Sequence, residues 1–288
     1  MSARFDVCIL GSANLDLVAT TRRLPLPGET VLGHGYAEHA GGKGLNQAVA
    51  AARSGASTAF VGALGSDEAG RRLMAVLNAE HIDVGGLAVV PGPTGRALIL
   101  VDDTGENSIV VVAGANGLVA TDAPIPPTAV LLAQLEVPIE TVTRAAATAR
   151  AAGGLVILNP APAAPLPPAL LAACDFLVPN QHELEHIGGV DAALAAGCRA
   201  VVVTRGADGV DVHTTAGVSH TTAFQVPVVD TTGAGDAFCG ALAARLAAGD
   251  PLDDAVRWAS AAGALATTVP GAVPAQPTAA AIERLLRS

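Results

Sequence analysis

Residues 230–238 read Asp-Thr-Thr-Gly-Ala-Gly-Asp-Ala-Phe, a glycine-rich turn that follows the strand-like segment 224–229 and opens an Ala-rich helix predicted over 235–248. Such a turn points backbone N–H groups and the positive end of the helix dipole at whatever lies above it, so it predicts an anion site for a phosphoryl group. Asp236 lies in the first helical turn, where it could take a proton from a hydroxyl aligned with that phosphate. The alternative is an ordinary N-capping turn, in which Asp and Gly are also common.

Short apolar runs alternate with helical stretches along the rest of the chain. This order is typical of an α/β fold in which a mostly parallel sheet is covered on both faces, with ligands at the carboxyl ends of the strands. The predicted strands are 7–10, 59–61, 129–132, 155–158, 176–178 and 201–203, and the other predicted helices are 44–54, 68–79, 140–152 and 252–267.

Two segments, about 14–37 and 94–112, interrupt this order because they alternate like strands with no helix between them. They predict a small projecting β-sheet that acts as a lid. The chain of 288 residues shows no linker or change of composition that would separate two halves. We therefore expect one domain over 1–288.

Composition excludes several classes of partner. The formal charge of −10 and the lack of a Lys/Arg cluster oppose binding to nucleic acid, because the phosphate backbone would be repelled. The sequence has no uninterrupted apolar run long enough for a membrane span and begins without a signal-peptide pattern, so a cytoplasmic protein with no membrane partner is expected. Its 4 cysteines are far apart, which favours buried thiols over a zinc site or a disulfide framework.

A second glycine cluster, Gly41-Gly42-Lys43-Gly44, runs into a helix that carries Asn46. Its amide, ammonium and carboxamide donors could bind sugar hydroxyls. The alternative is an ordinary helix start with an exposed Lys and no binding function. The sequence has no Walker A motif, no Rossmann glycine fingerprint and no protein-kinase motif set. The predicted phosphate site is therefore of another kind.

Both clusters, together with motifs along nearly the whole chain, resemble the signatures of the ribokinase (PfkB-type) family of carbohydrate kinases. The further matching segments, in the family's order, are 11–16, 25–30, 114–116, 134–136, 159–162, 179–183 and 204–209. The resemblance implies a three-layer α/β/α fold with a lid. It also implies an ATP-dependent kinase that acts on the 5-hydroxyl of D-ribose.

The resemblance assigns roles on the sugar side. Asp236 matches the catalytic base, and Gly233, Ala234 and Gly235 match the amides that stabilise charge on the transferring phosphate. The positions that match sugar ligands, besides Asp236, are Asn14, Asp16, Gly42, Lys43, Asn46 and Glu136.

On the nucleotide side, Asn180 and Glu183 match an element that orders Mg²⁺ and its water around the ATP phosphates. The remaining positions assigned to ATP are Thr204, Arg205, Gly206, Ala207, Asp208, Gly209, Gly235, Asp236 and Ser260. Family members also use a monovalent cation, usually K⁺, and the matching positions are Asp230, Thr232, Ala266, Val269 and Gly271. The segment between Glu183 and Val201 is shorter than the family pattern, and Ser260 replaces a frequent Asn or His near the adenine.

Three readings of the function remain. The first is a ribose kinase, and the second is a kinase of the same family for a nucleoside, another pentose or a keto-sugar acid. The third is a non-catalytic sugar-binding regulator, which the intact Asp236, Gly233 and Asn180 oppose. The apolar alternation of the lid strands also predicts a homodimer in which each lid covers the other.

Overall fold

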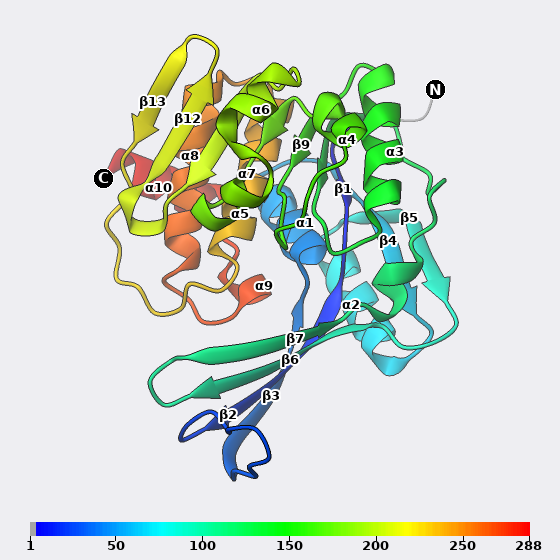
Figure 1. Ribbon diagram of the computed structural model, residues 1–288, viewed down its shortest axis with the longest axis vertical. Coiled ribbons are helices and arrows are strands. Elements are labelled where there is room, and N and C mark those ends of the chain that lie inside the picture. Colours follow the sequence, from blue (N-terminus) through cyan, green and yellow to red (C-terminus); the bar gives the residue numbers. More distant parts are fainter. Residues whose placement is uncertain (1–3) are drawn as a thin grey trace.

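The computed structural model describes residues 4–288, so residues 1–3 of the domain predicted over 1–288 lie outside the described residues. The main feature is a sheet of nine strands, with helices on both faces, from one side of which a second, small sheet projects (Figure 1). In spatial order the large sheet consists of β13 (Gly217–Thr221), β12 (Val210–Thr214), β11 (Ala200–Thr204), β10 (Phe176–Leu177), β9 (Leu155–Leu158), β8 (Thr128–Ala133), β1 (Phe5–Leu10), β4 (Thr58–Gly65) and β5 (Asp83–Val90). This is the predicted α/β fold with a mostly parallel sheet, because only β12 and β13 run antiparallel to their neighbours.

The central strands are apolar on both sides, which is why they lie in the middle of the sheet. Val7 and Ile9 belong to the core on one face, whereas Cys8 and Leu10 belong to the core on the other. Successive side chains of a strand point to opposite faces, so a continuous apolar run is stable only where both faces are covered.

Two groups of helices provide these covers. Contributors to the first core are α1 (Lys43–Arg53), α2 (Glu68–Ala79), α7 (Ala234–Ala247), α8 (Leu252–Ala266) and α10 (Ala279–Arg287), and contributors to the second are α3 (Ile139–Ala151), α4 (Pro168–Ala173) and α6 (Gly189–Ala195). The shorter helices are η1 (Gly114–Leu118), α5 (Gln181–His186), η2 (Gly206–Asp208) and α9 (Ala272–Ala275). None of the helices in residues 4–288 is long and apolar enough to span a bilayer.

Helices α1 and α7 approach each other unusually closely, and this contact builds the site. A Cβ on Gly240 of α7 would lie 2.5 Å from the Ala50 side chain and 2.5 Å from the Gln47 carbonyl oxygen of α1. Only glycine permits that separation. The first turn of α7 is thereby held against the first turn of α1.

The small sheet has the order β3 (Gly33–Gly41), β2 (Asn14–Thr21), β6 (Gly95–Asp102) and β7 (Asn107–Val112). It corresponds to the predicted lid, although its second strand ends at Gly41 and therefore passes the predicted limit at 37. Asn14 pairs with Gly41 on one side and with Gly95 on the other, so three lid strands meet the main body in one row.

The predicted strand at 224–229 is wrong, because this segment has no ladder partner and runs as irregular chain between β13 and α7. Pro227 lies in its middle, and proline cannot donate a hydrogen bond to a sheet ladder. Strands β5, β12 and β13 were not predicted. The glycines at 85, 86, 209 and 217 interrupt or border their alternating pattern.

Candidate active site

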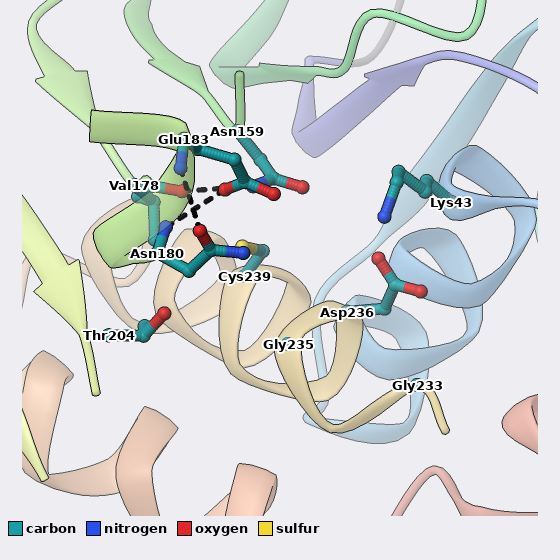
Figure 2. Close-up of a pocket in the computed structure, with 10 residues that line it drawn as sticks. All are labelled: Lys43, Asn159, Val178, Asn180, Glu183, Thr204, Gly233, Gly235, Asp236 and Cys239. Atoms are coloured by element: carbon teal, nitrogen blue, oxygen red, sulfur yellow. Dashed lines mark hydrogen bonds between the residues drawn. The ribbon is translucent and has the colours of Figure 1, made fainter. Parts of the chain in front are cut away.

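The two glycine turns of the sequence converge on one cavity at the carboxyl ends of the central strands. The cavity has a volume of about 150 Å³, and helix α7 begins at its floor (Figure 2). Its lining residues are Lys43, Asn159, Val178, Asn180, Glu183, Thr204, Gly233, Gly235, Asp236 and Cys239. A polar cavity at this edge of an open α/β sheet is the expected place for ligand chemistry.

Asp236 lies in the first turn of α7 and is only 8% exposed. Its two carboxylate oxygens accept hydrogen bonds from helix α1, Oδ2 from Asn46 Nδ2 at 2.9 Å and Oδ1 from Gln47 Nε2 at 2.9 Å. The carboxylate is thus held on both oxygens beside the cavity. This is a suitable arrangement for a general base, which must be oriented before it accepts a proton.

The glycine turn before Asp236 presents the open end of α7 to the same cavity. Gly233 is the N-cap with φ 76°, in the left-handed region that favours glycine. A Cβ on Gly235 would meet no other heavy atom within 4 Å, so the turn is open on the cavity side. The first N–H groups of a helix have no acceptor within the helix, which is why an anion site is predicted here. The Ala234 N–H already donates to the Thr231 carbonyl at 3.2 Å, which leaves the N–H groups of Gly233 and Gly235 for the predicted anion.

Lys43 begins α1, and Figure 2 shows its amine and the Asp236 carboxylate pointing into the same space. Burial acts to lower the pKa of Lys43, but the carboxylates of Asp236, Glu136 and Glu183 outweigh it, and the pKa lies above its usual value. The ammonium therefore stays charged. A charged ammonium beside a phosphoryl path can offset developing negative charge.

Residues predicted to bind the sugar lie where the small sheet joins the main body. Ser12 Oγ and the Lys43 N–H both donate to Glu136 Oε2, the latter at 3.1 Å. Asn14 Oδ1 accepts from Asn116 Nδ2 at 2.7 Å. The first bonds join Lys43 to Glu136. Asn14 lies beside the same turn, because a Cβ on Gly42 would be 2.8 Å from the Asn14 backbone nitrogen.

Asp16 has an unusual charge environment. Burial, reinforced by the Glu136 and Asp236 carboxylates, raises the pKa of Asp16 to about 7. Its carboxylate lies against Gly41, because a Cβ on Gly41 would overlap it. The amide of Asn46 donates to Asp236, but its Oδ1 is buried without a hydrogen-bond partner in the described chain, and a ligand hydroxyl could donate to this atom.

A second, larger cavity of about 490 Å³ adjoins the first. Of the residues predicted for ATP, Thr204, Gly206, Ala207, Gly209, Gly235 and Ser260 line it. Arg205 and Asp208 are not among its lining residues, and Arg205 Nη1 instead donates to Asp211 Oδ2 at 2.7 Å. Asn180 and Asp236 line the smaller cavity. Gly235 and Thr204 line both cavities.

Sequence reasoning missed the apolar walls of the larger cavity. The lining residues to which it assigned no role in ATP binding are Val210, Ala223, Phe224, Gln225, Val226, Val228, Thr231, Ala234, Phe238, Gly263, Ala264 and Thr267. Ala234 was assigned only to the anion site. Because 224–229 is irregular chain and not a strand, its side chains reach the cavity. Ser260 contributes little polarity, since its hydroxyl donates to the Val256 carbonyl at 2.8 Å.

Asn180 and Glu183 form a capping box at the start of α5. The Asn180 side chain accepts from the Glu183 N–H, and Glu183 Oε2 accepts from the Asn180 N–H, both at 2.8 Å. Burial raises the pKa of Glu183, partly opposed by that N–H and by Lys43. The second carboxylate oxygen of Glu183 remains for the cavity, and such an oxygen suits hydrated Mg²⁺. Residues 4–288 contain no cluster of three or more acidic, Cys or His ligands, so direct caging by side chains is not the expected mode.

Asp230 joins two loops below the glycine turn. Its Oδ1 accepts from the Thr232 N–H at 2.9 Å and its Oδ2 from the Gly271 N–H at 2.8 Å. Burial acts to raise the pKa of Asp230, but these donors outweigh it, and the pKa lies below its usual value. An ionised carboxylate between two loops fits a monovalent cation. No contact places the carbonyls of Ala266 and Val269, the other two predicted ligands.

Comparison with known proteins gives consistent results. The model of the pfkB family of carbohydrate kinases matches residues 4–279. A ribokinase of Haemophilus influenzae is 38% identical, with 96% of each chain covered, and a ribokinase of Bacillus subtilis is 37% identical, with 98% of this chain and 99% of the relative covered.

Among solved structures, the ribokinase of Thermotoga maritima superposes with a TM-score of 0.91 at 32% identity, covering 98% of this chain and 99% of that one. The ribokinase of Arabidopsis thaliana, solved with ribose and ATP, superposes with a TM-score of 0.89 at 30% identity, covering 99% and 100%.

Proposed function

The chain belongs to the pfkB family of carbohydrate kinases, and we propose that it is an ATP-dependent kinase that transfers the γ-phosphate to the 5-hydroxyl of D-ribose. The observation that carries this function is the small cavity in which Asp236, Lys43 and the glycine turn of α7 meet. It shares Thr204 and Gly235 with the larger cavity, which suits a nucleotide, and its Lys43 is hydrogen-bonded to Glu136, one of the residues predicted to bind the sugar.

In the proposed reaction, Asp236 accepts the proton of the ribose hydroxyl while the hydroxyl oxygen attacks the γ-phosphorus. The bond from phosphorus to the ADP oxygen breaks, and ADP leaves with that electron pair. The N–H groups of Gly233 and Gly235 and the Lys43 ammonium stabilise the negative charge on the transferring group. Preorganised donors of this kind usually provide a large part of the rate enhancement in phosphoryl transfer.

Ribose recognition is assigned to Asn14, Asp16, Gly42, Asn46 and Glu136. A carboxylate can accept two hydroxyl hydrogen bonds, which suits neighbouring hydroxyls of a polyol. The unpartnered Asn46 Oδ1 supports a hydroxyl donor at that point. The lid carries Asn14 and Asp16, so its closure would bring them onto the sugar and exclude water from the reaction.

Two cations fit this site. Mg²⁺ would be held through water by Glu183, beside Asn180, and would neutralise charge on the ATP phosphates. K⁺ would be held by Asp230 with carbonyl groups of Thr232, Ala266, Val269 and Gly271. The support is the ionised Asp230 carboxylate, which ties together the two loops that flank the glycine turn.

We also propose that two copies pair through their lids. Strand β7 is exposed at every position, and Ile109, Val110, Val111 and Val112 are 48–59% exposed. Consecutive β-branched side chains at a sheet edge favour pairing with another chain. Sedimentation of the purified chain tests this, since a monomer at micromolar concentration contradicts it. A cytoplasmic location stays a prediction.

The function is tested by coupled ADP release with Mg·ATP across ribose, deoxyribose, fructose, adenosine and 2-keto-3-deoxygluconate, with and without K⁺. We expect turnover on ribose and a decrease in kcat of about 10²- to 10⁴-fold in Asp236→Asn, because the amide cannot accept the proton. Turnover on another acceptor would retain the chemistry and replace ribose. Binding of ribose without any turnover would indicate a sugar-binding regulator.

A further inference from the structure

Gln47 is a fully buried polar residue, 0% exposed, for which the proposed reaction has no role. It follows Asn46 in helix α1 and lies below the Asp236 carboxylate. Its Nε2 donates to Asp236 Oδ1 at 2.9 Å and to Asn159 Oδ1 at 3.1 Å. Both hydrogens of its amide group are therefore used, one on the carboxylate and one on a neighbouring amide.

The network continues into three adjacent strands of the large sheet. Gln134, just after β8, donates from Nε2 to Gln47 Oε1. Asn159, just after β9, donates from Nδ2 to the carbonyl of Val178, just after β10, at 2.9 Å. Asp236 is thus connected through side-chain amides to the carboxyl ends of β8, β9 and β10, which are consecutive in the sheet.

Hydrogen-bond chemistry fixes the orientation of this network. An ionised carboxylate can only accept, so the Gln47 nitrogen must face Asp236 and its oxygen must face Gln134. The Val178 carbonyl can also only accept, so the Asn159 nitrogen must face it and its oxygen must face Gln47. The two ends require the same orientation, and Gln47 satisfies both.

We propose that Gln47 is a positioning residue for the catalytic base: it fixes Asp236 Oδ1, so that Oδ2 is the oxygen that takes the proton of the substrate hydroxyl. Oδ2 is held by Asn46, which is itself a proposed sugar ligand, so sugar binding can exchange that bond. The bond to Gln47 is buried in the network and persists. The inference rests on the proposed kinase reaction and adds the supporting residue and the reacting oxygen.

Charged groups around Asp236 disfavour a further carboxylate at position 47. Lys43 of α1 and Glu183 of α5 line the same cavity, and Glu136, after β8, and Asp16, on β2, lie on the sugar side. The Lys43 ammonium interacts with three of these carboxylates, those of Asp236, Glu136 and Glu183. An uncharged amide holds Asp236 in place without adding a further charge, whereas an ionised carboxylate at position 47 would repel it.

The first test compares the unsubstituted chain with Gln47→Met, which keeps the length and volume of the side chain and removes the donor. The matched control is Thr141→Val, which removes one buried hydrogen bond, to the Val119 carbonyl, on the opposite face of the sheet. We expect kcat to fall about 10- to 100-fold in Gln47→Met, as when supporting residues of other active sites are removed, with KM for ribose and ATP within about twofold.

We expect Thr141→Val to keep its kcat even if it loses a similar amount of thermal stability. An unchanged kcat in Gln47→Met, or a loss that appears only in KM, overturns the inference. A loss of kcat in both variants in proportion to their loss of stability also overturns it, because Gln47 would then be only structural.

Gln47→Glu provides a second test that remains decisive if the Met variant does not fold. A protonated Glu can donate one hydrogen bond to Asp236 Oδ1, but an ionised Glu cannot. The kcat of Gln47→Glu relative to the unsubstituted chain should therefore fall as the pH rises from 6 to 9. A ratio that does not depend on pH overturns the inference. If the unsubstituted chain has no kinase activity, the proposed function itself fails, which is a separate result.

Discussion

The raised pKa of Asp16 predicts that ribose affinity depends on pH near neutrality. Burial and the carboxylates of Glu136 and Asp236 raise this pKa to about 7 in the free protein. Asp16 is proposed to accept hydrogen bonds from sugar hydroxyls, and only the ionised carboxylate accepts on both oxygens. Below pH 7 the free protein is mostly in the protonated form, so ribose binding there must displace a proton.

The size of the effect follows from this pKa. The ionised fraction of Asp16 is about 0.1 at pH 6 and about 0.9 at pH 8, so KM for ribose should fall about ninefold over this interval. KM for ATP should change much less, because Asp16 is not among the residues that line the larger cavity, the proposed nucleotide site. In Asp16→Asn one charged acceptor is lost, which costs about 2 kcal/mol, or roughly 30-fold in KM for ribose.

The assay is coupled ADP release at saturating Mg·ATP, with ribose varied at half-unit steps from pH 6 to 8. Asp16→Asn is the control, because it should have a high KM that is nearly independent of pH. Thermal unfolding gives a second readout. The folded chain holds the Asp16 proton more tightly than the unfolded chain, so stability is lost as the pH rises through about 7. Asp16→Asn should therefore be more stable than the unsubstituted chain at pH 8 but not near pH 4. A constant KM for ribose in the unsubstituted chain would refute the reasoning.

Three other substitutions test separate parts of the site. In Gly95→Ala, the new methyl group would overlap the amides of Asn14 and Asn116, so KM for ribose should rise about tenfold with little change in KM for ATP. A KM for ribose equal to that of the unsubstituted chain would contradict this. Asp230→Ala should abolish activation by K⁺ and leave the K⁺-free rate nearly unchanged, as a titration with KCl would show. Val110→Lys, on the outer strand of the lid, should convert a dimer into a monomer by sedimentation, and a persistent dimer would argue against lid pairing.

Much of the fold is readable from the sequence because the alternating strands and helices each have a simple pattern. The run Val7-Cys8-Ile9-Leu10 has no polar position, which is possible only in a strand covered on both faces, and it lies at the centre of the large sheet. The lid segments alternate and have no helix between them, and they form the second sheet. The segment 224–229 was wrongly predicted as a strand, because its apolar residues line a cavity and not the interior of a sheet.

The candidate site was predictable to the extent that local motifs build it. The glycine turn and Asp236 occupy one stretch of chain, and Lys43 and Asn46 occupy another. No role was predicted for the amide residues Gln47, Gln134 and Asn159. Each is a common polar residue whose partner is 19 to 189 positions away. These contacts form only when α1 packs against α7 and the sheet. The run Asn46-Gln47 at the start of an apolar helix was the available signal, since a buried amide requires a partner.

Strand β7 also has a consequence for how the chain behaves during synthesis and purification. It is the last strand in the order of the small sheet, so within residues 4–288 the backbone groups on its outer edge have no partner strand. Its sequence Ile109-Val110-Val111-Val112 combines high β-propensity with no charge, which is the composition of segments that aggregate by strand pairing. Substitutions that weaken lid pairing without placing a charge in β7 should therefore reduce the soluble yield of the chain before they reduce its specific activity, whereas Val110→Lys should keep the monomer soluble.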